Sequence, residues 1–267
     1  MKKMSRPVIT STANGKVKRL VNLVKKRKIR DQEGIFVTEG PRMFEEAPRE
    51  RVREVYFSES FLGKAPEIWE KVKSSGIPAE ILSDHVFSHV SDTQTPQGVL
   101  AVVDRKEAAL EQILSETDPL LLVLDGLQDP GNLGTILRTG EGAGVTGIIL
   151  GGDCVDLYNP KTIRSTMGSV YRMPVCRCRD LTEALAEMKK KGILMYAAHL
   201  EGKNSYDQED YRKPCAFLIG NEGNGLRREV AEAADRWIRI PMKGQVESLN
   251  AAVAATVLMF EASRQRR

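Results

Sequence analysis

The chain has 267 residues, a formal net charge of +4 and 41% hydrophobic residues. This length favours two domains of unequal size, each with an apolar core. No apolar run approaches the ~20 residues that a membrane-spanning helix requires, and the basic start lacks the apolar segment of a secretory signal. A membrane protein and a secreted protein are therefore disfavoured.

The cysteines and histidines do not predict a metal site. None of the four cysteines shows the paired C-x-x-C spacing of zinc ligands, and His85 and His89 have no obvious further ligands beside them. We interpret all four cysteines as reduced thiols, which favours a cytoplasmic protein. They are Cys154, Cys176, Cys178 and Cys215.

Positive charge is concentrated at the N-terminus. Of the 40 Lys and Arg residues, eleven lie within residues 1–30, where no Asp or Glu occurs. We interpret this block as a footprint for nucleic-acid phosphates. A solvated helix face is the structural alternative, and a mitochondrial presequence ranks lowest because Lys outnumbers Arg. The residues of the block predicted to contact RNA are Lys16, Lys18, Arg19, Lys25, Lys26, Arg27, Lys28 and Arg30.

Residues 1–104 are predicted to form a small α/β domain. Val17, Leu20, Val21 and Val24 are spaced for one face of a helix. A strand at 34–40, a helix at about 41–47 and a strand at 52–60 follow. A helix over 65–76 ending at Gly76 precedes two strands at 77–84 and 98–104. The charged stretch 105–118 is predicted to be a linker.

Residues 119–267 alternate more regularly between strands and helices. Residues 120–125, LLLVLD, form a near-continuous apolar run, as a parallel strand buried on both faces requires. The alternation continues to a long helix from about Ser248 and predicts an open, mostly parallel sheet. In such sheets ligands bind at the carboxyl ends of the strands. The further elements are a helix at 133–144, strands at 146–150 and 172–178, a helix at 181–192, strands at 193–200 and 214–220, a helix at 221–234 and a strand at 236–242.

The first segment whose residues could take part in catalysis or binding is NLGTILR, 132–138, which follows the strand 120–125. Asn132 is placed to cap the following helix. Arg138 lies almost two turns into that helix. Its two interpretations are an ion pair with an acid and a cation held near a phosphate or a reacting group.

The second segment is FLIGNEGNGL, 217–226, where an apolar strand runs into a glycine-rich turn. Glycine allows the backbone to approach a ligand closely. The spacing fits neither the G-K-[ST] of a P-loop nor the G-x-G-x-x-G of a dinucleotide site. A small-molecule enzyme that uses ATP or nicotinamide is therefore poorly supported.

The third segment is IPMKGQVESLN, 240–250. Residues 240–242 are predicted to end a strand, and Ser248 to cap the final helix. The turn places hydroxyl, amide and backbone N–H groups at a helix N-terminus beside apolar side chains. A ligand made of adenine and methionine needs such a mixed site.

Taken in order, N-x-G-x-x-x-R, L-I-G-N-E-G-x-G and I-P-M-x(5)-S-L-N resemble the three motifs of the SpoU (TrmH) family. Its members are S-adenosylmethionine-dependent RNA 2′-O-ribose methyltransferases of the SPOUT superfamily. The resemblance covers about residues 118–265 and implies a deep trefoil knot, an exception to the rule against knots. Residues 1–104 resemble the family's L30e-like substrate-binding domain, with a looser match at 36–47.

The resemblance also implies site residues. The cofactor-binding residues would be Leu218, Ile219, Gly220, Asn221, Gly223, Ile240, Pro241, Met242, Ser248, Leu249 and Asn250. The polar active-site residues would be Asn132, Arg138, Glu222, Ser248 and Asn250. The family places this site at a homodimer interface, so we expect a homodimer.

The reaction explains these residue types. A ribose 2′-hydroxyl is a poor nucleophile at neutral pH, whereas a methyl sulfonium is a strong electrophile, so no metal is required. The enzyme has to align the reactants and help to remove the proton. A guanidinium is protonated and has no free base to offer, so we assign Arg138 positioning and charge stabilisation rather than proton removal. Asn132, Glu222 and Ser248 are expected to orient Arg138 and the substrate.

Large-subunit ribosomal RNA, such as 23S RNA, is the expected substrate. Transfer RNA and a non-catalytic role in ribosome assembly on the same fold are the alternatives. The intact polar set disfavours the non-catalytic role. Arg42, Lys161 and Arg164 are further predicted RNA contacts, although 159–169 is nearly as well interpreted as a structural loop.

Overall fold

The computed structural model describes residues 7–267, so the basic residues Lys2, Lys3 and Arg6 lie outside the described residues. The chain divides into two compact units. The first takes in residues up to 106 together with 158–171, and the second takes in 107–157 and 172–267. Within residues 7–267, none of the helices combines the length and the apolar character needed to cross a membrane.

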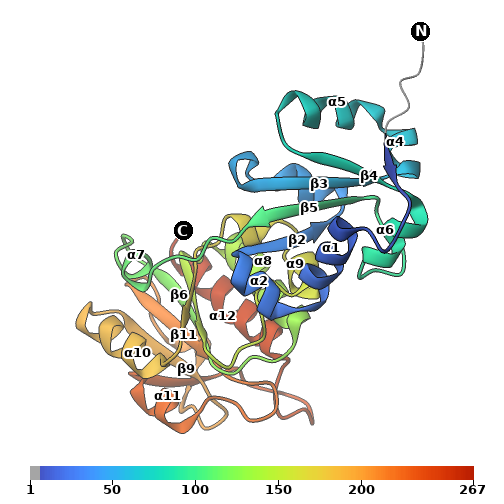
Figure 1. The fold of residues 1–267 in the computed structure, drawn as a ribbon. Helices are drawn as coiled ribbons and strands as arrows, with labels where there is room; N and C mark the ends of the chain where they lie inside the picture. The colour runs from blue at the N-terminus through green and yellow to red at the C-terminus, as the bar shows by residue number, and fades with distance from the viewer. Residues whose placement is uncertain (1–6) are drawn as a thin grey trace. The chain divides into compact units, whose positions relative to one another are not determined.

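The first unit has a five-stranded mixed sheet in the order β1-β4-β3-β5-β2 (Figure 1). Its strands are β1 (Val8–Ile9), β2 (Ile35–Glu39), β3 (Val52–Ser58), β4 (Ala79–Leu82) and β5 (Val99–Asp104). Its helices are α1 (Gly15–Lys25), α2 (Arg27–Glu33), α3 (Pro41–Glu46), α4 (Glu59–Lys64), α5 (Pro66–Ser74), α6 (Asp84–Val90) and α9 (Pro160–Thr166). Short 3-10 turns occur at Arg49–Arg51 and Ser169–Tyr171.

The sheet of this unit is buried on both faces, which explains its apolar strands. Successive side chains of a strand point to opposite faces. In β2, Ile35 and Val37 belong to a core cluster with α1 and α6. Phe36 points the other way, and its ring centroid lies 4.9 Å from that of Tyr158. Residues 158–171 therefore contribute to the core of the first unit, although the sequence places them within the second half of the chain.

The second unit has a seven-stranded sheet in the order β10-β12-β9-β11-β6-β7-β8, and every strand pair in it is parallel. The predicted open parallel sheet is thus confirmed. Its strands are β6 (Leu120–Leu124), β7 (Gly147–Gly151), β8 (Val175–Cys178), β9 (Leu194–Ala198), β10 (Asn204–Ser205), β11 (Cys215–Ile219) and β12 (Arg236–Arg239). Its helices are α7 (Leu110–Leu114), α8 (Pro130–Ala143), α10 (Leu181–Lys190), α11 (Arg228–Ala233) and α12 (Ala251–Gln265), with a 3-10 turn at Tyr206–Gln208.

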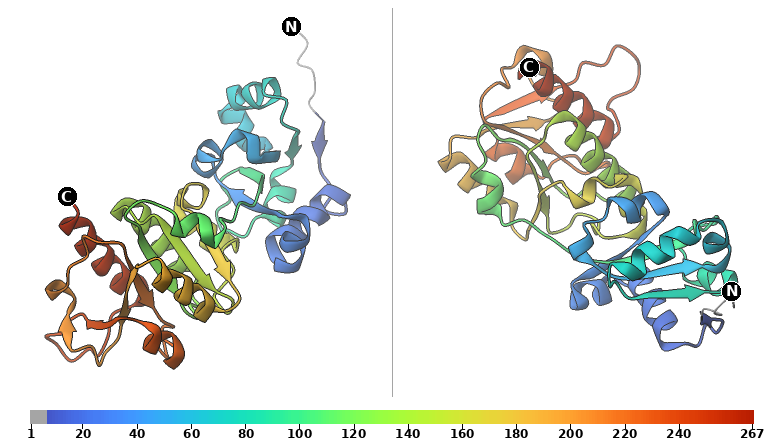
Figure 2. Two further views of the ribbon diagram at one scale, coloured as in Figure 1. Left: turned by 90° about the vertical axis from the view of Figure 1, so that its left-hand side faces the viewer. Right: turned by 90° about the horizontal axis from the view of Figure 1, so that it is seen from above.

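Helices cover both faces of this sheet. Leu121 and Val123 of the central strand β6 pack in one cluster with residues of α7, α10 and α11. On the other side α12 packs along α8, and the two helices lie side by side in Figures 1 and 2. Since the strands are parallel, the turns that follow β6, β7 and β11 lie at one edge of the sheet. The trefoil knot stays a prediction.

Two predicted helix caps are wrong, and both errors have a local cause. Pro130 takes the first position of α8, so the N-cap is Asp129, whose carboxylate accepts a hydrogen bond from Asn132 N at 2.8 Å. The N-cap of α12 is Asn250 rather than Ser248, because the Asn250 side chain accepts from the N–H groups of Ala252 and Val253. Strand β12 also ends at Arg239, before residues 240–242.

Candidate active site

The three segments meet through a chain of side-chain hydrogen bonds. Asn250 Nδ2 donates to Asn132 Oδ1 at 3.0 Å, although the two residues are 118 positions apart. Asn132 Nδ2 in turn donates to Glu222 Oε1 at 2.9 Å across 90 positions. Each segment thus contributes one residue to a single polar cluster at the ligand-binding edge of the parallel sheet.

Glu222 joins the glycine-rich turn to the start of α8. Its two carboxylate oxygens accept hydrogen bonds from the backbone N–H groups of Gln128 and Asp129, each at 3.1 Å. Burial raises the pKa of Glu222, but the hydrogen bonds from Asn132 and from these N–H groups outweigh burial and hold the pKa below its ordinary value. Glu222 is therefore a carboxylate at neutral pH, and it accepts hydrogen bonds at a helix N-terminus, where negative charge is favoured.

The glycine-rich turn is held tightly against itself. A Cβ atom on Gly220 would lie 2.1 Å from the carbonyl carbon of Gly225, so only glycine fits. Gly225 has a φ of +69°, which favours glycine as well. The Asn221 side chain donates to Gly126 O at 2.8 Å and accepts from Gly223 N at 2.8 Å. The backbone of Asn221 closes the turn as well, because its N–H donates to Gly225 O at 2.9 Å and its carbonyl accepts from Gly225 N at 3.0 Å. Both the side chain and the backbone of Asn221 thus shape the turn.

The third segment forms the open side of the site. Residues 240–249 have no regular structure, and most of their side chains are exposed. Ser248 is exposed, and its hydroxyl makes no hydrogen bond to any residue within 7–267. The apolar side chains of Ile240, Met242 and Leu249 are half-buried. Half-buried apolar side chains and the exposed hydroxyl of Ser248 thus lie in the same segment.

Two predicted cofactor contacts are core residues. Leu218 is fully buried and belongs to the apolar cluster with α10 and α11. Ile219 is 3% exposed and ends strand β11. Their side chains fill the interior of the sheet, and the Ile219 carbonyl accepts a hydrogen bond from Asp125 N at 2.9 Å. The predicted contact of these two side chains with the cofactor is therefore not supported by their burial. Pro241, in contrast, is exposed.

Arg138 stands apart from the polar cluster. It lies six residues after Asn132 on α8, which is roughly 9 Å along the helix axis and about 120° around it. Its side chain is exposed and forms no hydrogen bond or ion pair with any residue of the described part of the chain. The expected orientation of Arg138 by Asn132, Glu222 and Ser248 is therefore absent among residues 7–267.

Sequence reasoning missed Asp125 and Gln128. Asp125 is 1% exposed, and its carboxylate accepts from both the backbone N and the Nε of Arg227, at 2.8 and 2.7 Å. Gln128 Nε2 donates to Gly126 O and Asp153 O, at 3.1 and 2.9 Å. An available signal for Asp125 was an acidic residue directly after an apolar parallel strand, where ligand sites form.

The basic N-terminal residues separate into structural and unpaired ones. Arg30 is 3% exposed, and its guanidinium donates to the carbonyls of Leu23 and Val24. Its predicted contact with RNA is therefore wrong, because the side chain closes the end of α1 instead. Arg19 pairs with Glu33 and Glu54, at 2.7 and 2.6 Å, so its charge is compensated.

Several other predicted RNA contacts have acidic partners. Lys16 pairs with Glu80, Arg27 with Asp31, Arg42 with Glu46 and Arg164 with Asp92. Lys161 is exposed in the first turn of α9. Within residues 7–267, the basic side chains of the N-terminal block that lack an acidic partner are Lys18, Lys25, Lys26 and Lys28.

His85 and His89 both lie on α6 and are exposed. Among residues 7–267, no group of three or more His, Cys, Asp or Glu side chains is arranged to hold a metal ion. All four cysteines are free thiols.

Both units of the chain match families of known proteins. Residues 119–260 match the SpoU rRNA Methylase family, and residues 14–101 match the MRM3-like substrate binding domain. The chain is 35% identical over 254 residues to the 23S rRNA (guanosine(2553)-2′-O)-methyltransferase of Bacillus subtilis, covering 94% of this chain and 97% of the relative.

It is also 34% identical to a 23S rRNA (guanosine-2′-O-)-methyltransferase of Xanthomonas campestris, over 75% of this chain and 83% of the relative. The crystal structure of an AdoMet-bound rRNA methyltransferase from Sinorhizobium meliloti superposes with a TM-score of 0.84 at 31% identity, covering 97% of both chains. With its three motifs joined in one cluster, the chain belongs to the SpoU rRNA methylase family.

Proposed function

We propose that this protein transfers a methyl group from S-adenosylmethionine to a ribose 2′-hydroxyl of large-subunit ribosomal RNA. The observation that carries this proposal is the hydrogen-bonded chain Asn250–Asn132–Glu222, which joins the three motif segments in one site. The relatives named as 23S rRNA 2′-O-methyltransferases support the substrate class.

The residues present fit the cofactor. Close backbone packing at Gly220 shapes a tight turn at the end of β11, and the adjacent segment 240–249 offers apolar side chains beside unpaired polar groups. An adenosine with a methionine side chain needs such a combination. When bound, S-adenosylmethionine supplies an electrophilic methyl group. The AdoMet-bound neighbour supports the same cofactor here.

The polar cluster is suited to holding the substrate rather than to removing its proton. Glu222 is ionised and already accepts hydrogen bonds from Asn132 and two backbone N–H groups. Glu222 therefore holds Asn132 and the N-terminal end of α8 in position. Arg138 keeps its charge at any physiological pH and stabilises the developing alkoxide or the neighbouring phosphate. Ser248, which has an unpaired hydroxyl within the described residues, contacts the cofactor or the ribose.

We further propose a homodimer in the cytoplasm. Val253 and Phe260 lie seven residues apart on one face of α12, with 49% and 43% of their surfaces exposed. Large apolar side chains on one face of a helix favour a protein partner. Arg138 on the neighbouring helix α8 also lacks a partner within residues 7–267. A second copy would cover the apolar face and receive Arg138 at its own site.

Membership of the SpoU family supports the prediction of a trefoil knot in the second unit.

Radiolabelled S-adenosylmethionine tests the reaction. The protein is incubated with unmodified large-subunit rRNA and, separately, with tRNA, and 2′-O-methyl nucleotides are mapped by mass spectrometry. We expect methylation of the ribosomal RNA. Methylation of tRNA alone would favour the alternative substrate, and cofactor binding without transfer to either RNA would contradict the proposal and favour a non-catalytic role.

Arg138→Ala tests the role of the arginine. We expect loss of transfer, by a factor of about 100 or more, because charge stabilisation in the transition state disappears. Cofactor binding, measured by calorimetry, should stay unchanged. Arg228→Ala is the control, since Arg228 is an exposed arginine on α11 that pairs with Glu232. Normal transfer by Arg138→Ala would show that the assigned role is wrong.

A further inference from the structure

The first unit contains a cavity that is lined by residues between 41 and 99, so none of the basic residues before residue 31 contributes to it. It has a volume of about 110 Å³ and lies between α3, α5 and the strands β3 and β5. An ordered water needs only about 10–15 Å³, so this space is large enough for a group of several atoms. Its walls are mainly apolar and include Phe44, Val52, Ile68 and Val72.

Three of the four exposed residues that line the cavity are charged, and the fourth is Ser75. Arg49, Lys71 and Glu45 line it, and all three are exposed, which places them at its opening. Within residues 7–267, neither Arg49 nor Lys71 forms an ion pair or a side-chain hydrogen bond. Two unpaired cations beside an apolar recess complement a ligand that joins a phosphate to a flat apolar group.

Phe44 gives the recess an aromatic wall. The side chain is half-buried, and its ring meets Phe57 edge-on with centroids 6.3 Å apart. Phe57 is fully buried and packs further on Phe61 and Trp69, so Phe44 is held by a rigid aromatic cluster. RNA-binding proteins stack unpaired bases on aromatic side chains held in this way.

We propose that this cavity receives one unpaired nucleobase of the RNA substrate, with the adjoining phosphate bound by Arg49 and Lys71. The proposal rests on the proposed function, because it takes RNA as the substrate. An apolar peptide is the rival occupant. It would use the apolar wall but would leave both cations at the opening without a partner.

Direct binding is tested with the full chain and the four nucleoside 5′-monophosphates. In a sample labelled at Ile and Val methyl groups, we expect the NMR signals of Ile68 and Val72 to shift on titration. Ribose 5-phosphate, which has no base, should leave them in place. No shift with any monophosphate, or equal shifts with ribose 5-phosphate, would overturn the base pocket.

Two variants test the cavity in the reaction. Ala47→Met fills the recess from its buried wall, and Arg49→Ala combined with Lys71→Ala removes both cations. For each we expect the KM for ribosomal RNA to rise about tenfold, the scale of one stacked base, with kcat unchanged. Lys64→Ala combined with Lys73→Ala is the control, since it removes the same charge from exposed positions of α4 and α5 that do not line the cavity.

The outcomes separate the two proposals. An unchanged KM in folded Ala47→Met, checked by thermal unfolding, would overturn the base pocket while methyl transfer by the wild type still supported the proposed function. If the wild type methylated no RNA, the proposed function would fail, and the monophosphate titration would still decide what the cavity binds.

Discussion

At the scale of single residues, Glu222 connects two loops through its charge. Its folded pKa lies below the ordinary value of 4.5 because donors surround the carboxylate. A lowered folded pKa contributes stability above the unfolded pKa, and this contribution is lost as the pH falls through the folded value. We expect the stability of the wild type to decline below about pH 4.5 partly for this reason.

Glu222→Gln tests this expectation. The amide keeps an acceptor but loses the charge, so the hydrogen bonds from Gln128 and Asp129 weaken and the variant should lose about 1 kcal/mol at pH 7. The difference in the free energy of unfolding between the variant and the wild type, measured by urea unfolding, should become smaller at pH 4 and below. Glu229→Gln, an exposed residue of α11, is the control. A difference that is constant with pH would show that the charge of Glu222 does not stabilise the fold.

Gly220 shows how a backbone contact makes a residue indispensable. A Cβ atom at this position would meet the backbone of Gly225 and Leu226 at 2.1 and 2.2 Å, and a backbone cannot move aside as a flexible side chain does. We expect Gly220→Ala to open the turn and to weaken cofactor binding at least tenfold in calorimetry. Gly142→Ala should bind normally, because nothing lies within 4 Å of its Cβ position. Normal binding by Gly220→Ala would contradict a role for the tight turn.

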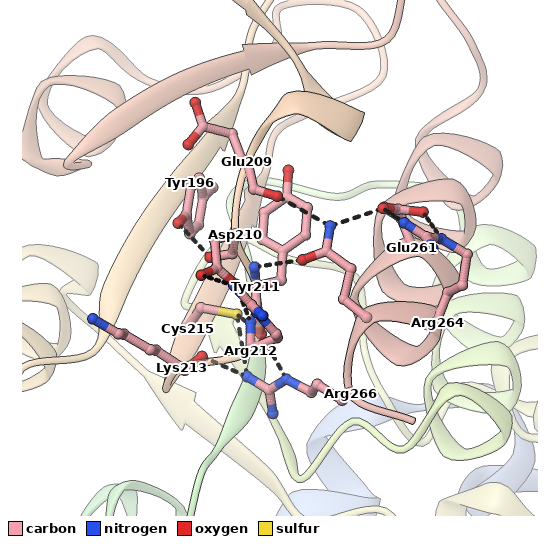
Figure 3. A network of polar contacts seen from close by, with 11 residues as sticks. Tyr196, Glu209, Asp210, Tyr211, Arg212, Lys213, Cys215, Glu261, Arg264 and Arg266 are labelled. Atoms are coloured by element: carbon pink, nitrogen blue, oxygen red, sulfur yellow. Dashed lines mark hydrogen bonds and ion pairs between the residues drawn. The ribbon is translucent and has the colours of Figure 1, made fainter.

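At the scale of elements, the end of α12 is fastened to the amino-terminal side of the parallel sheet. Arg266 donates to the carbonyls of Tyr211 and Lys213, each at 2.7 Å (Figure 3). It also donates to the carbonyl of Asp118 at 2.8 Å. Gln265 Oε1 accepts from Tyr211 N at 2.9 Å. These contacts join the last helix to the segments that precede β6 and β11. They fix the C-terminal end of the helix whose N-cap is the site residue Asn250.

Arg266→Ala should therefore destabilise the second unit. Several charge-assisted hydrogen bonds are lost together, so we expect the free energy of unfolding, measured in urea, to fall by about 1–3 kcal/mol. Arg264→Ala is the control, because Arg264 is exposed and pairs with Glu261 of the same helix, an interaction that solvent screens. Equal effects of the two variants would show that the contacts of Arg266 do not stabilise the helix.

The elements show which features a sequence can predict. The hydrophobic spacing correctly predicted α1 and the burial of Val17, Leu20 and Val24, but Val21 is only half-buried and the unpredicted Leu23 is buried in its place. The apolar runs predicted the parallel sheet. These signals are local. The cap of α12 was misplaced because Ser248 and Asn250 are both good capping residues. The burial of Arg30 depends on tertiary packing, which the local sequence does not express. The separation of Arg138 from Asn132, in contrast, follows from their six-residue spacing on one helix and could have been predicted.

At the scale of the whole molecule, Arg138 lies apart from the other polar residues of the site within one chain. Glu222, Asn132 and Asn250 form one cluster, while Arg138 points elsewhere on α8 and lacks a partner among residues 7–267. If a second copy receives Arg138, each site of a two-fold dimer is built from both chains. Two variants with different defects then complement each other.

Arg138→Ala and Glu222→Gln are co-expressed with different tags, and the heterodimer is purified. We expect Glu222→Gln to lower the methyl-transfer rate as well, because the start of α8 is no longer fixed. If Arg138 acts across the interface, one site of the heterodimer has both defects and the other has none, so about half of the wild-type rate should return. If Arg138 acts within its own chain, each site keeps one defect and the rate stays near that of the single variants. The second result would contradict a shared site even where the dimer itself is found by light scattering.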